Sequence, residues 1–206
     1  MSQEPSNINW RPNADIKTLK LRAEIISKIR YFFKKNEVLE IDTPVMAHAP
    51  VTDPYLQALE ITPEYNSQKK LYLQTSPEYA MKRLLAAGSG CIYQICKAFR
   101  DEPSGPQHNI EFTMLEWYRV GFDYINLIQE IMDLLNQISL WPKAQIKSYQ
   151  EIFEDFFNIN PHIILKKDLI EIAKKNNCYP IIGLDKPTKD DLLMLLFSKK
   201  IEPKFA

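Results

Sequence analysis

The sequence places an arginine, glutamates and an aromatic ring on the two sides of one short polar loop. Phe99-Arg100-Asp101-Glu102 precedes the loop, and His108-Asn109-Ile110-Glu111-Phe112 follows it. The apolar-rich segments 91–100 and 110–119 predict a long antiparallel hairpin with this loop at its tip. An arginine there can clamp a phosphate with both arms of its planar guanidinium, a carboxylate can accept from a purine amine, and a ring can stack on a base. These residue types indicate a nucleotide site built from side chains.

Other ways of binding a nucleotide have little support. Only five glycines occur, and none form a phosphate-cradling loop of the P-loop or dinucleotide kind. Lys plus Arg equals Asp plus Glu, 26 against 26, so no large positive field favours broad binding to a nucleic-acid backbone.

The three cysteines, Cys91, Cys96 and Cys178, lack metal-ligand spacing, and we expect inert thiols in a reducing cytosol.

The elements that must position these residues predict an α+β fold. Expected helices cover about 19–35, 124–140, 149–156, 167–176 and 189–198, and expected strands cover 38–41, 55–61, 71–75 and the two hairpin arms. A further helix should have Ser76 as its N-cap and Pro77 as its first residue, and should end at Gly88. Residues 45–54 are expected to form a loop. Because no regular βαβ alternation occurs, we expect an antiparallel sheet flanked by helices.

Neither export nor a membrane is expected. The first fifteen residues are polar, which is unlike a signal peptide. No apolar run reaches the ~20 residues that span a bilayer. The sequence therefore predicts a cytoplasmic protein with no membrane partner.

The residues around the loop resemble a known family. Phe-Arg-Asp-Glu, a variable loop and then His-Asn-x-Glu-Phe-Thr-Met-Leu-Glu-Trp-Tyr is similar to the second signature motif of class II aminoacyl-tRNA synthetases, in the wording of the lysine group. Residues 20–44 resemble the first motif, which builds the dimer interface in this class. Residues 71–85 resemble the segment that reads the amino acid.

A finer resemblance points to one branch. Three segments are similar to the stand-alone family that ligates (R)-β-lysine to elongation factor P: Trp10-Arg11-Pro12, Val51-Thr52-Asp53 and Thr75-Ser76-Pro77-Glu78. Only about 18 residues precede the first motif, too few for the five-stranded OB-fold module that binds an anticodon. The resemblance thus implies elongation factor P as acceptor and (R)-β-lysine or lysine as substrate, and tRNA is not expected.

The resemblance also implies a reaction and roles for single residues. The substrate carboxylate attacks the α-phosphate of ATP, with Mg²⁺ bridging phosphates, and the acyl group then passes to the acceptor. Arg100 is the implied catalytic residue at the α-phosphate, and no metal-ligating residue is assigned. The implied ATP-binding residues are Arg100, Asp101, Glu102, His108, Asn109 and Phe112; the implied substrate-binding residues are Ser76, Pro77, Glu78 and Tyr118. Glu78 should pair with an ammonium group, and Tyr118 should reach the distal amine.

In the family, the catalytic domain continues beyond the position of Ala206 and carries a third signature motif there. We therefore expect 1–206 to be a partial catalytic domain, with an N-terminal extension (1–18), the first two motifs (19–140) and a mainly helical insertion (141–206). A homodimer through 20–44 is implied.

Three interpretations stay open: a ligase of the elongation factor P type, incomplete as given; a catalytic fragment of lysyl-tRNA synthetase; and a non-catalytic paralogue that dimerises and binds a ligand. Ser76 and the missing anticodon module argue against the second. The missing third motif favours the last.

Overall fold

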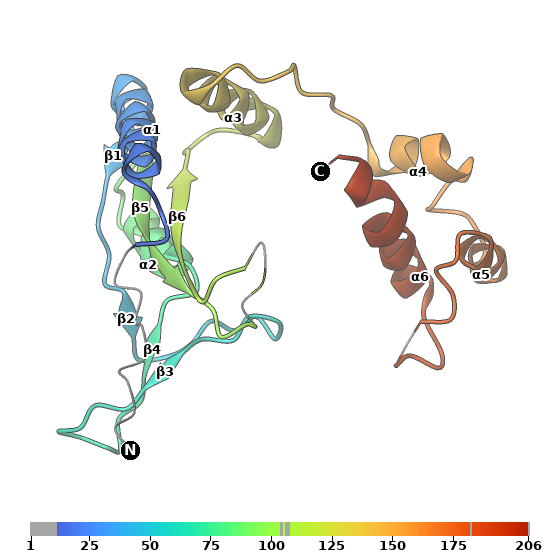
Figure 1. The fold of residues 1–206 in the computed structure, drawn as a ribbon, viewed down its shortest axis with the longest axis horizontal. Coiled ribbons are helices and arrows are strands. Elements are labelled where there is room, and N and C mark those ends of the chain that lie inside the picture. Colours follow the sequence, from blue (N-terminus) through green and yellow to red (C-terminus); the bar gives the residue numbers. More distant parts are fainter. Residues whose placement is uncertain (1–11, 104, 106–107, 182, 206) are drawn as a thin grey trace, which may run out of the picture. The chain divides into compact units, whose positions relative to one another are not determined.

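The structure is a computed structural model that describes residues 12–103, 105, 108–181 and 183–205. The chain divides into two compact units, Met1–Lys143 and Ala144–Ala206 (Figure 1). Within the described ranges, no helix is long and apolar enough to cross a membrane. Residues 1–11 of the expected N-terminal extension, including Trp10 and Arg11, lie outside the described residues. The assignment of the whole chain to one partial catalytic domain stays a prediction.

A long hairpin forms the centre of the first unit. β5 (Ile92–Phe99) pairs antiparallel with β6 (Glu111–Tyr118), in a register that sets Ile92 opposite Tyr118 and Phe99 opposite Glu111. The hairpin predicted from the two apolar segments is confirmed. Because side chains alternate along each strand, its two faces carry different residues and do different work.

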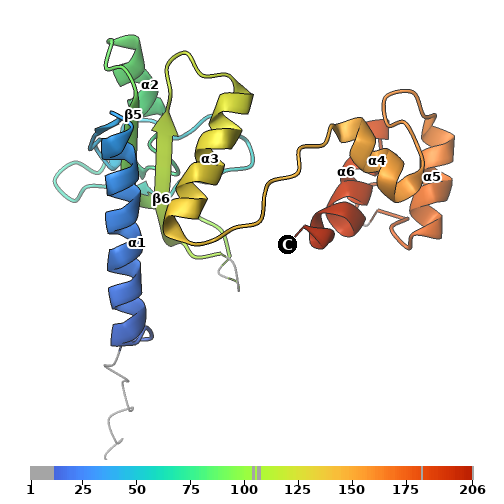
Figure 2. The same cartoon turned by 90° about the horizontal axis from the view of Figure 1, so that it is seen from above.

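One face of the hairpin packs against α1 (Ile16–Lys35) and α3 (Tyr124–Ile138) (Figure 1, Figure 2). The ring of Phe33 is fully buried and stacks on Tyr93 with 4.4 Å between ring centres. α1 begins at Ile16 rather than Leu19, because the Asp15 carboxylate accepts the backbone N–H of Thr18 at 2.6 Å and caps the helix. This packing fixes the hairpin against α1 and α3 and leaves its other face free for the candidate site.

The α+β class is confirmed, but the expectation of one antiparallel sheet is wrong. β1 (Leu39–Glu40) pairs with β5 in parallel, and β2 (Met46–Ala47), β4 (Leu71–Leu73) and β3 (Glu60–Ile61) form a second sheet in that order. Pro44 has no N–H to donate to a ladder, so the chain leaves the first sheet before it starts the second. β2 also falls within residues 45–54, which were expected to be a loop.

The strand expected over 55–61 is shorter than predicted. Asp53 accepts two backbone N–H groups, that of Tyr55 on its carboxylate at 2.8 Å and that of Leu56 on its carbonyl at 3.3 Å. Such local bonding of an aspartate to the following backbone favours a turn over a strand. Only Glu60–Ile61 remain as β3.

α2 (Glu78–Ala86) follows the second sheet. It begins one residue later than expected, with Pro77 at the cap position. The Ser76 hydroxyl still accepts the backbone N–H of Glu78 at 3.1 Å, which is the bond that the predicted N-cap was meant to make. The helix ends as expected, with Gly88 in the left-handed region at φ +87°.

The second unit is helical, as predicted. It contains α4 (Tyr149–Phe157), α5 (Lys166–Lys175) and α6 (Lys189–Leu196), followed by a π-helical turn (Phe197–Ile201) and a 3₁₀ turn (Glu202–Lys204). The helix expected over 189–198 is thus α-helical only to Leu196. The buried core of the second unit consists of Phe153, Leu169, Ala173, Leu192, Leu193, Leu196 and Ile201.

Candidate active site

The face of the hairpin away from α1 carries the residues singled out in the sequence. Phe112, Glu116 and Tyr118 are separated by even numbers of residues on β6, so they share this face, whereas Trp117 points into the core behind it. The same alternation on β5 directs Arg100, just beyond the strand end, to the same side. One surface of the hairpin therefore carries, in order, the guanidinium of Arg100, the ring of Phe112, the carboxylate of Glu116 and the hydroxyl of Tyr118.

Arg100 and Phe112 lie together at the loop end of the hairpin. The guanidinium carbon of Arg100 is 5.2 Å from the centre of the Phe112 ring, and the backbone N–H of Arg100 donates to the carbonyl of Ile110 at 3.0 Å. Nε of Arg100 is buried and has no hydrogen-bond partner among the described residues. A buried donor without a partner costs about 1–3 kcal/mol, so an anionic ligand oxygen at this place would be stabilised.

The other predicted ATP-binding residues of the loop take no part in the contact between Arg100 and Phe112. They are Asp101, Glu102, His108 and Asn109, of which only Glu102 is half-buried and the rest are exposed. Asp101 donates its N–H to the carbonyl of Gln57 at 2.9 Å, Glu102 donates to Arg100, and His108 pairs with Gly105. Across the described part of the chain, the hydrogen bonds of these loop residues run through their backbone, so the structure does not assemble their side chains around Arg100.

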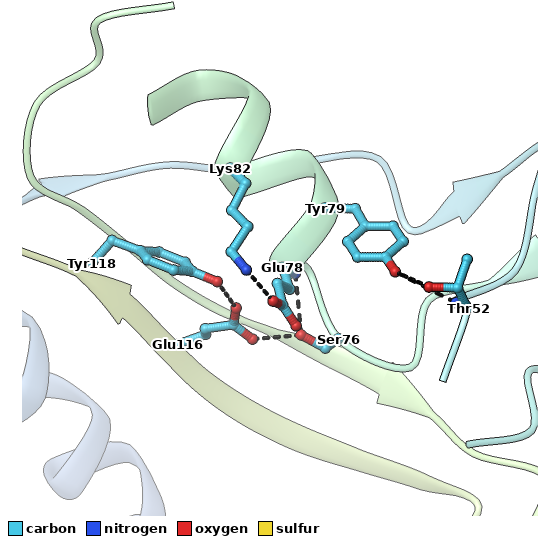
Figure 3. Close-up of polar contacts among 7 residues, drawn as sticks. All are labelled: Thr52, Ser76, Glu78, Tyr79, Lys82, Glu116 and Tyr118. Atoms are coloured by element: carbon cyan, nitrogen blue, oxygen red, sulfur yellow. Dashed lines mark hydrogen bonds and ion pairs between the residues drawn. The ribbon is translucent and has the colours of Figure 1, made fainter. Parts of the chain in front are cut away.

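Glu116 forms the centre of a second cluster on the same face (Figure 3). It lies four residues from Phe112, roughly 13 Å at the rise of a strand. Ser76 donates its hydroxyl to one carboxylate oxygen at 2.6 Å, and Tyr118 donates its hydroxyl to the other at 2.7 Å. Because Ser76 also accepts the N–H of Glu78, the cluster fastens the start of α2 to the hairpin.

The protonation state of Tyr118 follows from its surroundings. Burial raises the pKa of Tyr118 well above its ordinary value, and the hydrogen bond to the Glu116 carboxylate raises it further. The phenol is therefore neutral at physiological pH and donates its proton to Glu116. Its oxygen keeps lone pairs that can accept from a ligand cation.

Glu78 lies beside this cluster and pairs with Lys82, one turn further along α2 (Figure 3). The hydrogen bond to Glu78 raises the pKa of Lys82 above its ordinary value. Both side chains are largely exposed, and exposed pairs of this kind contribute little to stability. An incoming ammonium group can therefore replace Lys82 at the Glu78 carboxylate.

Glu116 was absent from the residues predicted from sequence. The period-2 alternation of the strand could have identified it, since it is a charged residue on the face that also carries Phe112, Met114 and Tyr118. Pro77, by contrast, was predicted to bind substrate and is fully buried at the start of α2, where it shapes the backbone between Ser76 and Glu78.

The Cys96 thiol on this face is not a candidate nucleophile. Burial raises the pKa of the Cys96 thiol, and the Glu116 carboxylate raises it further, which keeps the thiol protonated and a poor nucleophile. Over the described residues, no group of three or more His, Cys, Asp and Glu side chains is arranged to hold a metal ion.

Comparison with known proteins assigns the chain to a family. The family described as tRNA synthetases class II (D, K and N) matches residues 5–197. The chain belongs to this family. Members of the class II synthetase family use ATP and Mg²⁺, which is consistent with a nucleotide site built on the hairpin.

Curated relatives of this class II synthetase-family chain are named elongation factor P--(R)-beta-lysine ligase. The protein from Haemophilus influenzae (strain PittGG) is 47% identical over 201 residues, covering 96% of this chain and 61% of the relative. That from Vibrio parahaemolyticus is 46% identical over 203 residues, covering 96% and 62%. That from Pasteurella multocida is 45% identical over 198 residues, covering 95% and 60%. The chain spans about three-fifths of the length of these relatives.

Proposed function

We propose that this chain provides the nucleotide and amino-acid recognition of an ATP-dependent ligase. The ligase activates (R)-β-lysine or lysine as an adenylate and transfers it to a lysine of elongation factor P. The names of the relatives support the amino acid and the acceptor. The observation that carries the proposal is the cluster in which Ser76 joins the Glu116 carboxylate to the start of α2, beside Glu78.

Two neighbouring carboxylates suit a substrate with two ammonium groups. We assign the ammonium nearer the substrate carboxyl to Glu78, which gives up Lys82, and the distal ammonium to Glu116 and the Tyr118 oxygen. A monoamine analogue would leave the Glu116 charge without a cation, held only by the hydroxyls of Ser76 and Tyr118, and sites of this kind reject such analogues. Ser76 touches both sides of this arrangement, and we propose that its hydroxyl adapts the pocket to a β-amino isomer.

The loop end of the hairpin is assigned to ATP. Arg100 would contact the α-phosphate, where negative charge builds in the transition state, and Phe112 would lie under the adenine. The loop residues Asp101, Glu102, His108 and Asn109 are assigned to ATP on the resemblance of the motif, and their side chains would have to turn toward the nucleotide. Mg²⁺, when bound through the phosphates, neutralises part of their charge.

The two steps follow from these positions. A carboxylate oxygen of the amino acid bonds to the α-phosphorus, the bond to the β-phosphate oxygen breaks, and pyrophosphate leaves. The neutral acceptor amine of elongation factor P then attacks the acyl carbonyl and forms the amide, the bond between the acyl carbon and the phosphate oxygen breaks with its electron pair going to AMP, and the amine proton passes to solvent. The chain contributes positioning and charge stabilisation to both steps, and no side-chain nucleophile is needed.

The test compares one substitution at two places on β6. Glu116→Gln removes the charge at the centre of the cluster, whereas Glu111→Gln makes the same change on the opposite face, where Glu111 pairs with Lys97. Hydrogen bonds to charged groups contribute about 1.5–3 kcal/mol, so binding of lysine should weaken roughly 10- to 150-fold in the first variant. The control should stay within about twofold of wild type.

ATP–pyrophosphate exchange and isothermal titration with lysine and (R)-β-lysine provide the measurements. Equal loss in both variants would contradict the assignment of Glu116. Binding of lysine with no exchange by the folded chain would instead support the non-catalytic paralogue. Transfer of lysine to tRNA and none to elongation factor P would support the lysyl-tRNA synthetase fragment.

We also propose that residues 20–44 form a homodimer interface. Within that segment the described side chains of Leu21, Tyr31 and Leu39 are 55%, 59% and 56% exposed, which is high for large apolar residues. Sedimentation velocity on Leu21→Glu should give a lighter species than wild type. Identical sedimentation at all concentrations would contradict the interface.

A further inference from the structure

Gln94 is a buried amide on the candidate-site face of β5. The hairpin register sets it directly opposite Glu116, and its side chain is only 1% exposed. Residues that face each other across antiparallel strands share one face of the sheet, with Cβ atoms roughly 4.5–5.5 Å apart. Gln94 therefore adjoins the carboxylate that we assign to the distal ammonium of the ligand.

Thr43 holds the amide of Gln94 in one orientation. Its hydroxyl donates to Oε1 of Gln94 at 3.0 Å, and Thr43 is itself buried. The parallel course of β1 along β5 brings Thr43 to this place, since the N–H of Ile41 still donates to the carbonyl of Tyr93 at 2.9 Å. Because the amide oxygen of Gln94 faces Thr43, the amide nitrogen is turned away from it.

That nitrogen is a buried donor that lacks an acceptor. Over the residues that the structure describes, Nε2 of Gln94 has no hydrogen-bond partner. A buried donor in this state destabilises the fold until an acceptor satisfies it. An amide NH₂ group cannot accept from an ammonium, so Gln94 does not bind a ligand amine directly. The residue directly opposite, Glu116, carries a group that only accepts.

Glu116 has room for one more protein donor. An ionised carboxylate offers about four lone-pair sites. Ser76 donates to one oxygen and Tyr118 to the other, which fills one site on each. The last torsion of Gln and Glu side chains is broad, so the terminal groups of Gln94 and Glu116 need only turn to meet. A third donor would leave one lone pair, with a fixed direction, for a single ammonium group.

We propose that Gln94 is a positioning residue for Glu116. Its amide, held by Thr43, supplies the third donor to the carboxylate and directs the remaining lone pair at the distal ammonium of the ligand. The neutral amide also keeps this part of the site at one negative charge, because two carboxylates face to face could not both ionise freely. The identity of the ligand rests on the proposed function. The contact between Gln94 and Glu116 does not.

The first experiment exchanges the two side chains and needs no ligand. Gln94→Glu alone sets two carboxylates opposite each other and should lower the urea midpoint of unfolding. Adding Glu116→Gln restores one carboxylate and one amide, so the double variant should unfold at a higher urea concentration than Gln94→Glu alone. Adding Glu111→Gln instead changes the opposite face of β6 and should give no such recovery.

The second experiment measures binding of lysine by isothermal titration. Gln94→Met keeps the length of the side chain and removes the amide, so the dissociation constant should rise roughly two- to twelvefold. Thr43→Val should act in the same direction, and it should add nothing in the Gln94→Met background, because Thr43 acts through Gln94. Gln129→Met, the same change at an exposed glutamine of α3, is the control and should bind as wild type does.

The exchange of side chains also gives a rescue. The double variant Gln94→Glu with Glu116→Gln should bind lysine more tightly than Glu116→Gln alone, since a carboxylate returns to the same place. Additive losses of stability in the double variant would overturn the contact between the two residues. Recovered stability with no recovery of lysine binding would overturn the role in positioning. If wild type bound no lysine, the proposed function would fail, and the stability measurements alone would decide the contact.

Discussion

Glu130 offers a stringent test of the packing behind the hairpin. It lies on α3, is only 7% exposed, and accepts the indole N–H of Trp117 at 3.0 Å. Its other carboxylate oxygen is 3.1 Å from Nε of Arg119, a distance that makes an ion pair although the N–H is not aligned for a hydrogen bond. Arg119 is itself mostly buried, at 13% side-chain exposure. One carboxylate thus ties α3 to the end of β6.

Glu130→Ala should therefore destabilise the first unit strongly. Removing one partner of a buried ion pair leaves the other charge uncompensated, which costs about 3–5 kcal/mol. Glu130→Gln keeps an acceptor for Trp117 and loses only the charge, so about 1.5–3 kcal/mol is expected. Glu24→Ala is the control, because Glu24 is 61% exposed in its pair with Lys28 and such pairs contribute about 0.2–1 kcal/mol.

Urea titration followed by tryptophan fluorescence measures these differences. Trp117 packs against the core of the first unit, and no tryptophan lies in the second, so tryptophan emission reports on unfolding of the first unit. With a urea dependence of about 2 kcal/mol per molar, the midpoint should fall by roughly 1.5–2.5 M in Glu130→Ala. A loss no larger than that of Glu24→Ala would refute the claim that Glu130 is a buried structural anchor.

Three further outcomes are expected. Arg100→Ala should lower adenylate formation in the ATP–pyrophosphate exchange assay by about 10²–10³-fold with unchanged circular dichroism, and retained exchange would remove Arg100 from the mechanism. Burial raises the pKa values of Tyr93 and Tyr118 above the ordinary value of 10.0, so in the unfolded chain these phenols ionise first. The free energy of unfolding should hence be constant just below pH 10 and fall as the pH rises above it, and Tyr118→Phe should flatten this fall in denaturant titrations across that range. Phe153→Ala, at a fully buried ring of the second unit, should cost about 3–5 kcal/mol by far-UV circular dichroism, and a loss below 1 kcal/mol would contradict the described core.

Elements with strong local signals were predicted well from the sequence. The two arms of the hairpin are apolar-rich segments on either side of a polar tip, and Gly88 ends α2 because glycine tolerates a positive φ. Helix starts were less accurate, since α1, capped by Asp15, begins three residues before the expected start at Leu19. Capping is a local bond, and a closer inspection of Asp15 and Thr18 would have found it.

Contacts between distant segments were missed. The parallel pairing of β1 with β5, the second sheet and the bond between Thr52 and Tyr79 all join residues far apart in the chain. Periodicity reports which face of an element is apolar, but it does not say which other element covers that face. Alternation could have placed Glu116 on this face, but its bond to Ser76, 40 residues away, is a long-range contact of the same kind.

The sequence by itself predicted the kind of chemistry. The order of arginine, acidic loop and aromatic ring around a hairpin tip, in the wording of the second synthetase motif, indicated nucleotide binding by side chains. Arg100 and Phe112 lie on neighbouring strands of one hairpin, so local geometry is enough to bring this pair together. Only the tertiary structure decided which carboxylates meet at the other end of the hairpin. Glu116 and Ser76 come into contact because α1 and α3 occupy one face of β5 and β6, which leaves the opposite face to the start of α2.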